Sequence, residues 1–365
     1  KNNTLKQINL FFKKQNMKKK SLSAKKIIHK KLIKNLKNNR INKVFKIFKN
    51  NLGFIKTNNI AVAVSGGPDS LALSYLVKCL VINNKKKAFF YLVDHKIRKN
   101  SSIESKSIRR LLKNYDIKCK ILTWKGKKPK SNLQSVARNK RYSLIYEQCI
   151  KDNVKYLITG HHIDDLYENF FLRILRGSGL GGFVSFNSIK NKLNDNLYVY
   201  RPLINIKKED LIYITKKVFG YYLDDPSNYK NDFKRVRLRK FIDQFKEEGL
   251  DIQKLNLTIN NLTSSNEAIN YYVNKNISEN TRILKKSTYI LNKEFLNNPT
   301  DVIFRSFSRI LKLVGTKYYP PRGKSLIYLI KFIESNHNGK MTLSGCVIEK
   351  VNNSLLIYKE KRQKT

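Results

Sequence analysis

The middle of the chain alternates short apolar runs with longer segments in which apolar residues recur every three or four positions. Short apolar runs bounded by turn residues are typical of buried strands, and the longer period is typical of amphipathic helices. The sequence therefore predicts strands at 60–64, 88–93, 117–122 and 156–159, and helices at 70–81, 101–114, 134–152 and 164–175. This alternation predicts an α/β fold with a doubly wound parallel sheet, which binds ligands at the carboxyl ends of its strands.

The pattern changes after about residue 240. The stretch 240–335 is mainly helical, with interruptions rich in Asn and Ser, and the tail 341–359 alternates like a small β-meander. We therefore expect a basic arm, partly helical or disordered, then a catalytic domain, a helical substrate-binding domain and a small α+β segment. Their expected bounds are 1–50, 51–238, 239–318 and 319–365.

Charge narrows the class of partner. The chain has 75 Lys and Arg against 26 Asp and Glu, a formal charge of +49, and its first acidic residue is Asp69. Such a charge favours a polyanion, and tRNA is the obvious candidate. Lys, Asn and Ile are abundant throughout, however, so part of the charge reflects general composition.

The apolar runs and the cysteines further restrict the class of protein and the kind of site. No run of about 18 uncharged apolar residues is present, so we expect no membrane association. The four cysteines are scattered and form no CxxC pair, which favours buried thiols in a reducing compartment, the cytoplasm, over a zinc or sulfur-transfer site.

The turn after the first predicted strand is the clearest candidate for an anion site. Its glycines allow close backbone approach, and the amides at the start of the following helix point at a bound phosphate. The residues are Ser65, Gly66, Gly67, Pro68, Asp69 and Ser70. The two serines add hydroxyl donors and Asp69 can hold a metal ion, although an ordinary strand–turn–helix corner is the alternative. The loop lacks the lysine and the spacing of the common P-loop.

A second cluster follows the predicted strand at 156–159, in the segment GHHIDDLYE at 160–168. Asp165 and Glu168 share a face of the predicted helix, and His161 lies at the strand end. Two carboxylates on one face suit Mg²⁺ or an ammonium group. The alternatives are simple capping of the helix N-terminus and, more weakly, a zinc site.

Three arginines accompany these motifs. Arg138 and Arg141 lie on the helix predicted at 134–152, and Arg176 precedes a glycine-rich turn. Solvated arginines on helix surfaces are the alternative interpretation.

Together these motifs resemble the tRNA(Ile)-lysidine synthase family of the N-type ATP pyrophosphatase, or PP-loop, group. The resemblance runs from about residue 58 to the tail, and its motifs are SGGPDS, DHKIR, ARNKRY, GHHIDDLYE, RILRGSGLGG and the RVRLR of 235–239. The first motif is shared by the whole group, whereas the later ones in this order are specific to the family. Val236 stands where the family usually has Asn, and Leu166 where it commonly has Gln.

The resemblance implies an adenine nucleotide alpha hydrolase-like fold and a two-step reaction that uses ATP and Mg²⁺. ATP adenylates the oxygen at carbon 2 of the wobble cytidine in the tRNA(Ile) that carries a CAU anticodon. The ε-amino group of L-lysine then displaces AMP, which forms lysidine and changes decoding from AUG to AUA. Members of the family are often homodimers.

The resemblance also implies residue roles. Catalysis falls to Asp69, His161, Asp165 and Glu168, of which Asp69 holds Mg²⁺ and the last two bind or deprotonate lysine. His161 contacts phosphates or assists proton transfer. ATP is bound by the six loop residues with Arg138, Arg141 and Arg176, and tRNA phosphates by Arg235, Arg237 and Arg239.

Two other classes of function stay open. Another tRNA base-modifying PP-loop enzyme would share the loop, although a thiolase needs cysteine pairs that this sequence lacks, and an ammonia-using ligase needs a glutaminase domain or partner. A basic RNA-binding module with a vestigial nucleotide site is the second. The retained residues Asp69, His161, Asp165 and Glu168 argue against loss of the nucleotide site.

Overall fold

The computed structural model describes most of the chain from residue 22 to residue 360. The residues it does not describe are 1–21, 54, 56, 85, 99, 127–128, 130–132, 188–189, 195–196, 225–233, 286–287, 318–319, 336–338 and 361–365. The chain forms two compact units, Lys1–Ile252 and Gln253–Thr365.

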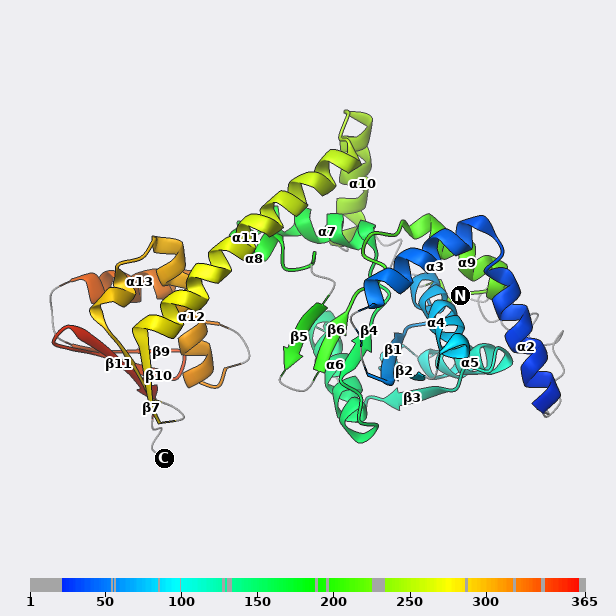
Figure 1. Ribbon diagram of the computed structural model, residues 1–365, viewed down its shortest axis with the longest axis horizontal. Helices are drawn as coiled ribbons and strands as arrows, with labels where there is room; N and C mark the ends of the chain where they lie inside the picture. Colours follow the sequence, from blue (N-terminus) through cyan, green and yellow to red (C-terminus); the bar gives the residue numbers. More distant parts are fainter. Residues whose placement is uncertain are drawn as a thin grey trace. The chain divides into compact units, whose positions relative to one another are not determined.

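A six-stranded sheet of order β3-β2-β1-β4-β6-β5 organises the first unit (Figure 1). Five strands pair in parallel and β5 is an antiparallel edge. Their bounds are β1 Asn59–Val64, β2 Lys87–Asp94, β3 Cys119–Thr123, β4 Tyr156–Ile158, β5 Lys190–Asn194 and β6 Leu197–Tyr200. The predicted parallel sheet is confirmed, and β5 and β6 extend it beyond the four predicted strands.

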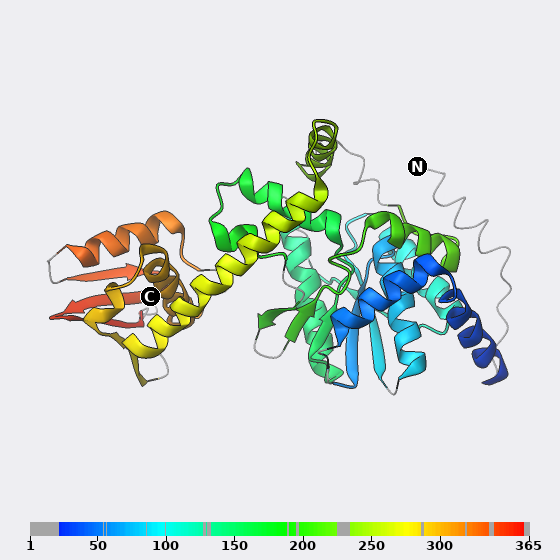
Figure 2. The same cartoon turned by 45° about the horizontal axis from the view of Figure 1, so that its top comes forward.

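Helices cover both faces of this sheet (Figure 2). On β1, Ile60 and Val62 pack into the core shared with α4, α5 and α9, whereas Ala61 packs on the opposite face against Ile145 of α6. Because strand side chains alternate between faces, one strand supplies both cores. The helices are α4 Pro68–Asn83, α5 Ser101–Asn114, α6 Leu133–Lys151, α7 Ile163–Ile174, α8 Leu180–Phe183, α9 Lys208–Phe219 and α10 Lys234–Glu247.

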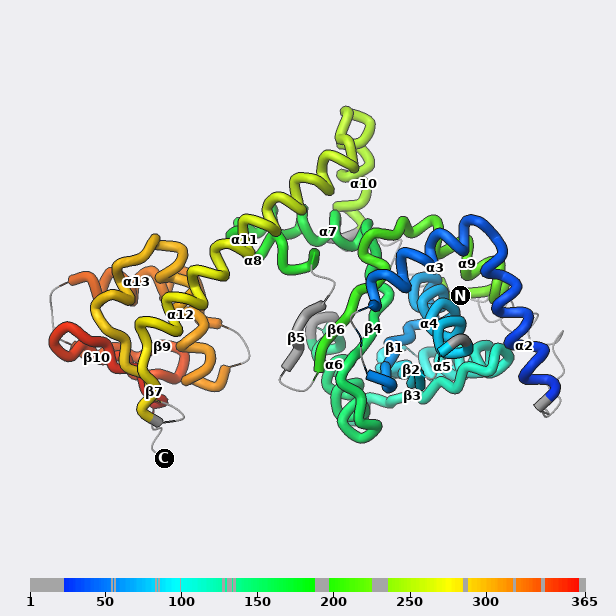
Figure 3. Tube along the Cα trace, in the orientation of Figure 1, coloured from blue at the N-terminus to red at the C-terminus, as the bar shows by residue number. Residues whose placement is uncertain are grey.

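Two helices precede the sheet in sequence, α2 Leu22–Asn35 and α3 Asn39–Leu52, and they pack onto the same core. Leu32, Ile41 and Phe48 are almost fully buried, and the tube in Figure 3 shows α3 beside α4 and α9. From residue 22 onward, the segment predicted as a basic arm is therefore a folded part of the first unit, whereas 1–21 lie outside the described residues.

The second unit combines three helices with an antiparallel sheet of order β7-β8-β11-β10-β9. Its elements are α11 Ile252–Asn280, β7 Thr281–Lys285, β8 Thr288–Leu291, η2 Lys293–Leu296, α12 Thr300–Val314, α13 Gly323–Glu334, β9 Lys340–Leu343, β10 Cys346–Val351 and β11 Ser354–Lys359. The hairpin β7–β8 falls in a stretch predicted as mainly helical. One core joins Leu291, Phe307 and Ile357, so the boundary predicted between 318 and 319 lies inside this unit.

Within the described parts of both units, no helix combines the length and the apolar character that crossing a membrane requires.

A partly buried charge cluster ties α2 to the end of α5. Lys78 Nζ donates to Asp116 Oδ2 at 2.8 Å and to the Asp116 carbonyl at 2.7 Å, and His29 Nε2 lies 2.9 Å from the same carboxylate oxygen. Burial on its own raises the pKa of Asp116, but the hydrogen bonds from Lys78 and His29 outweigh burial and lower the pKa. The charged carboxylate therefore stabilises the fold.

Asp116→Asn should lower the free energy of unfolding by about 1 kcal/mol at pH 7, the scale of one partly buried hydrogen-bonded pair. Because the folded-state pKa of Asp116 is depressed, this stabilisation is present above about pH 4 and is lost as the pH falls through the folded-state pKa. Urea unfolding followed by fluorescence of Trp124, the single tryptophan, measures it in the first unit. Asp243→Asn, at an exposed pair, is the control, and equal losses in both variants would contradict the assignment.

Candidate active site

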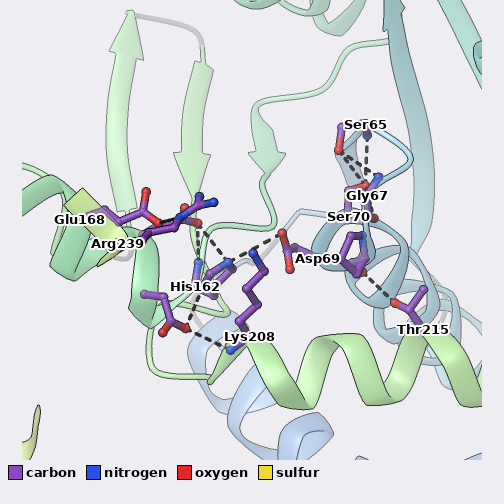
Figure 4. Close-up of polar contacts among 12 residues, drawn as sticks. Ser65, Gly67, Asp69, Ser70, His162, Glu168, Lys208, Thr215 and Arg239 are labelled. Carbon is purple, nitrogen blue, oxygen red and sulfur yellow. Dashed lines mark hydrogen bonds and ion pairs between the residues drawn. The ribbon is translucent and has the colours of Figure 1, made fainter. Parts of the chain in front are cut away.

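The loop 65–70 connects the carboxyl end of β1 to the first turn of α4, and the Ser70 hydroxyl holds it compact (Figure 4). Ser70 Oγ accepts from the backbone amides of Ser65 at 3.1 Å and Gly66 at 3.2 Å, and it donates to the Gly67 carbonyl at 3.0 Å. Pro68 occupies the first turn of α4, where a missing amide hydrogen costs nothing. The result is a tight turn at a helix N-terminus, the geometry that binds anions.

Gly66 is required by its backbone conformation and by its neighbours. Its φ is +91°, and a Cβ there would lie 2.8 Å from Leu223 Cδ1 and 2.9 Å from Ile108 Cγ1. The Gly66 carbonyl accepts from the Leu223 amide at 2.9 Å, and Thr215 of α9 donates to the Pro68 carbonyl at 2.7 Å. Contacts from α5, α9 and the segment after α9 therefore fix the loop from outside.

The end of β4 approaches the same loop closely. A Cβ on Gly160 would lie 3.1 Å from the backbone carbon and oxygen of Asp69 and 3.2 Å from the amide of Ser70. In the sheet, β1 and β4 are neighbours and the strand order reverses between them, which is where such sheets bind ligands. This approach brings the segment 160–168 beside the loop.

His162 is the imidazole that the structure places among the carboxylates. It is 3% exposed, and its Nε2 lies 3.7 Å from Asp69 Oδ2 and 3.6 Å from Asp165 Oδ2, while Nδ1 lies 3.3 Å from Asp164 Oδ2. Burial alone lowers the pKa of His162, but the ion-pair contacts with Asp164 and Asp69 and the charge of Asp165 raise it to about 10. At neutral pH His162 is therefore a buried cation that draws three carboxylates together.

The sequence pointed to the neighbouring His161. Its Nδ1 lies 2.9 Å from Thr159 Oγ1, and its ring packs edge-on to Phe186 at 5.1 Å between centroids. Two adjacent histidines at a strand end point in different directions, and spacing alone does not say which one turns inward. In the capping box of α7, Asp165 Oδ2 accepts from the His162 amide at 3.2 Å, which holds the His162 backbone at the start of the helix.

Glu168 of α7 is 4% exposed and pairs with Arg239 of α10 through its Oε1 (Figure 4). Burial alone lowers the pKa of Arg239, but the hydrogen bond to Glu168 and the charges of Glu168, Asp165 and Asp69 raise it. The sequence predicts Arg239 as a phosphate-binding residue. In the structure the Nε of its guanidinium pairs with the buried Glu168 carboxylate, and its role toward phosphate stays a prediction.

Two buried carboxylate oxygens have no hydrogen-bond partner among the described residues: Asp69 Oδ1 and Glu168 Oε2. In Figure 4 His162 lies between Asp69 and the Glu168–Arg239 pair. A buried carboxylate oxygen without a hydrogen bond lowers the stability of the fold unless a ligand donates a hydrogen bond to it or a metal ion binds it. The arrangement therefore offers one acceptor at the phosphate loop and a second on α7.

The first of these acceptors fits Mg²⁺. Within the described ranges no three His, Cys, Asp or Glu side chains gather as a metal site. Mg²⁺ bound with nucleotides needs only one or two protein carboxylates, because phosphate oxygens and water supply its other ligands. The free oxygen of Asp69, at the loop, matches that requirement.

The remaining predicted arginines lie at the surface. Arg138, Arg141, Arg176 and Arg237 are exposed, and the side chain of Arg235 lies outside the described residues. Arg141 Nε donates to His95 Nε2 at 3.3 Å, and the Arg138 guanidinium lies 5.4 Å from the centroid of the Tyr142 ring.

Arg201 begins the segment RPL at 201–203, which belongs to the family resemblance, but no site role was predicted for it. It directly follows β6, is 9% exposed, and lies 4.7 Å from the centroid of the Phe186 ring. Burial lowers its pKa. Its position at a strand end would have marked it, but β6 was not among the predicted strands.

Comparison with known proteins agrees with this geometry. Residues 36–245 match the PP-loop domain family. A tRNA(Ile)-lysidine synthase from Orientia tsutsugamushi is 31% identical over 84% of this chain and 71% of that protein. One from Rickettsia typhi is 33% identical over 85% of this chain and 72% of that protein. Among solved structures, a U34-tRNA thiolase from Methanococcus maripaludis aligns with a TM-score of 0.51 at 17% identity, over 59% of this chain and 75% of that one, which supports the fold.

Gly160→Ala should weaken ATP binding about tenfold, because the new methyl group meets the Asp69 backbone, which cannot yield without moving the loop. Gly323→Ala is the control, since its added Cβ would make only an ordinary 3.8 Å contact with Phe304. Calorimetric titration with ATP and Mg²⁺ measures both. Unchanged affinity in Gly160→Ala would mean that the close approach does not shape the nucleotide site.

Proposed function

Because the chain belongs to the tRNA(Ile)-lysidine synthase family of PP-loop enzymes, we propose that it joins L-lysine to carbon 2 of the wobble cytidine of tRNA(Ile). The substrate is the tRNA with a CAU anticodon, and the product lysidine changes its decoding from AUG to AUA. The observation that supports this most directly is the pair of partnerless carboxylate oxygens, one on the loop and one on α7. The reaction needs an acceptor at each place.

The first step is adenylation of the cytidine. The oxygen at carbon 2 attacks the α-phosphorus of ATP, a new oxygen–phosphorus bond forms, and pyrophosphate leaves. The amides of the loop and the N-terminus of α4 would stabilise the charge that develops on pyrophosphate. Mg²⁺, when bound, supplies further charge neutralisation, and Asp69 Oδ1 is the oxygen available to hold it. Arg138, Arg141 and Arg176 would contact the outer phosphates.

The second step is attack by lysine. The ε-amino nitrogen forms a bond to carbon 2, the bond from carbon 2 to the adenylated oxygen breaks, and AMP leaves. Before attack the ammonium group must give up a proton to a nearby base. Glu168 Oε2 is buried and without a partner, so it would hold the ammonium and take the proton, with Asp165 beside it. Arg239 acts as a positioning residue, because its hydrogen bond to Oε1 orients the carboxylate.

His162 joins the two halves of the site. Asp69 belongs to the ATP half and Asp165 to the lysine half, and both carboxylates lie within 4 Å of the buried imidazolium. Without that positive charge the carboxylates would repel one another. We assign His162 a positioning role.

Other assignments extend the proposal. Arg235 and Arg237 would contact tRNA phosphates, and the second unit would contribute to tRNA binding through its basic surface. We also propose a homodimer and a cytoplasmic location, on the ground that members of this family are often homodimers and that the scattered cysteines suit a reducing compartment.

Incubation with ATP, Mg²⁺, radiolabelled L-lysine and tRNA(Ile) bearing CAU tests the proposal. We expect label in this tRNA and none in the elongator methionine tRNA, which has the same anticodon and serves as the control. Label in neither tRNA, with ATP binding intact, would favour a different base modification by the same adenylation chemistry.

Glu168→Gln should raise the KM for lysine about tenfold or more and leave the KM for ATP within about twofold, because the lost charge belongs to the proposed lysine half of the site, whereas Asp69 serves the ATP half. Steady-state kinetics with each substrate varied in turn measures the two values. The control is Glu147→Gln, the same change at an exposed carboxylate. Parallel increases in both KM values would refute the separate lysine subsite.

A further inference from the structure

The helix pair α2–α3 presents a one-sided distribution of charge. Residues 22–52 contain nine lysines and one arginine and no acidic residue. All nine lysines are exposed: Lys25, Lys26, Lys30, Lys31, Lys34, Lys37, Lys43, Lys46 and Lys49. Among the described residues none of them forms an ion pair.

The opposite face of the pair is apolar and buried. Leu32 of α2 and Ile41, Val44 and Phe48 of α3 are at most 3% exposed. The spacing of the three α3 residues is that of one helical face, so Lys43, Lys46 and Lys49 of α3 lie away from it. Lys26, Lys30 and Lys34 form a stripe at intervals of four residues, or about 6 Å along the helix.

Polar contacts fix the pair to the catalytic unit. Tyr75 of α4 donates to the Leu32 carbonyl at 3.1 Å, and Asn38 donates to Tyr213 of α9 at 3.1 Å. Arg40 donates to Asp210 of α9 at 2.6 Å. The lysines are thus carried on a fixed surface.

The same helix α9 contacts the active site. Its Thr215 donates to the Pro68 carbonyl of the phosphate loop, and its Lys208 amide donates to Asp164 at 3.1 Å (Figure 4). The start of α3 and the nucleotide site are therefore attached to one helix.

We propose that the exposed lysine face of α2–α3 binds the sugar–phosphate backbone of the tRNA substrate while its wobble base is in the active site. The argument is charge complementarity on a folded surface: lysines without ion-pair partners gain most from phosphates, which release counterions on binding. The proposal rests on the proposed function for the identity of the RNA. The α2–α3 surface adds affinity and position without reading sequence.

The test compares three full-length variants by fluorescence anisotropy with labelled tRNA(Ile) at several salt concentrations. The first carries Lys→Gln at all five α2 lysines, residues 25, 26, 30, 31 and 34. The second carries Lys→Arg at the same positions, which keeps the charge. The third carries Lys→Gln at five exposed lysines elsewhere in the first unit, residues 113, 118, 120, 151 and 155.

We expect the first variant to bind tRNA about tenfold or more weakly near 0.1 M salt, with a slope of log affinity against log salt shallower by about 2 to 4. The Lys→Arg variant should bind like the wild type, and the control variant should change the slope by less than about 1. Lysine transfer at saturating tRNA should stay within about twofold of wild type in the first variant. The anisotropy assay measures tRNA affinity without catalysis. A wild-type protein that transfers no lysine would therefore refute the proposed function, and the comparison of affinities would still be valid.

Equal losses in the first and third variants would overturn the proposal, because the charge would then act only as a general background. Unchanged tRNA affinity in the first variant would also overturn it. If that variant instead lost binding to vesicles containing phosphatidylserine, the surface would be one that binds anionic membranes.

Discussion

The buried charge of His162 is the interaction on which the site depends. One imidazolium, almost without exposure to water, lies within 4 Å of oxygens from Asp69, Asp164 and Asp165. These carboxylates come from two segments, the phosphate loop and the start of α7, and they would repel one another without it. The close approach of Gly160 to the Asp69 backbone makes the same junction from the side of β4. Charge and shape therefore join the two halves of the site.

Several elements were predictable from local pattern. The strands before 65 and 160 are short apolar runs, and the loop between β1 and α4 has residues suited to only a few backbone conformations. Parallel strands place their carboxyl ends together, so the sequence could bring Asp69 and the segment 160–168 to one edge. For this reason the sequence was enough to predict which segments of the chain form the site.

Other features depend on contacts between distant residues. Glu168 and Arg239 are paired although they lie 71 residues apart in the sequence, and no local pattern predicts this pair. Thr215 acts on the loop only because α9 packs beside α4. The lysine-rich start of the chain resembles a leader in composition, and the burial of Leu32 shows that α2 also folds with the catalytic unit. Such features follow from tertiary packing, which the sequence pattern does not specify.

The central claim is that Asp69 serves the nucleotide half of the reaction and Glu168 the lysine half. Incubation of tRNA(Ile) with ATP labelled at the α-phosphate, without lysine, isolates the first half. Glu168→Gln should adenylate this tRNA at a rate close to wild type and release AMP more slowly than wild type at the same lysine concentration, whereas Asp69→Asn should not adenylate it. A Glu168→Gln enzyme that cannot form the adenylated tRNA would contradict the division of the site.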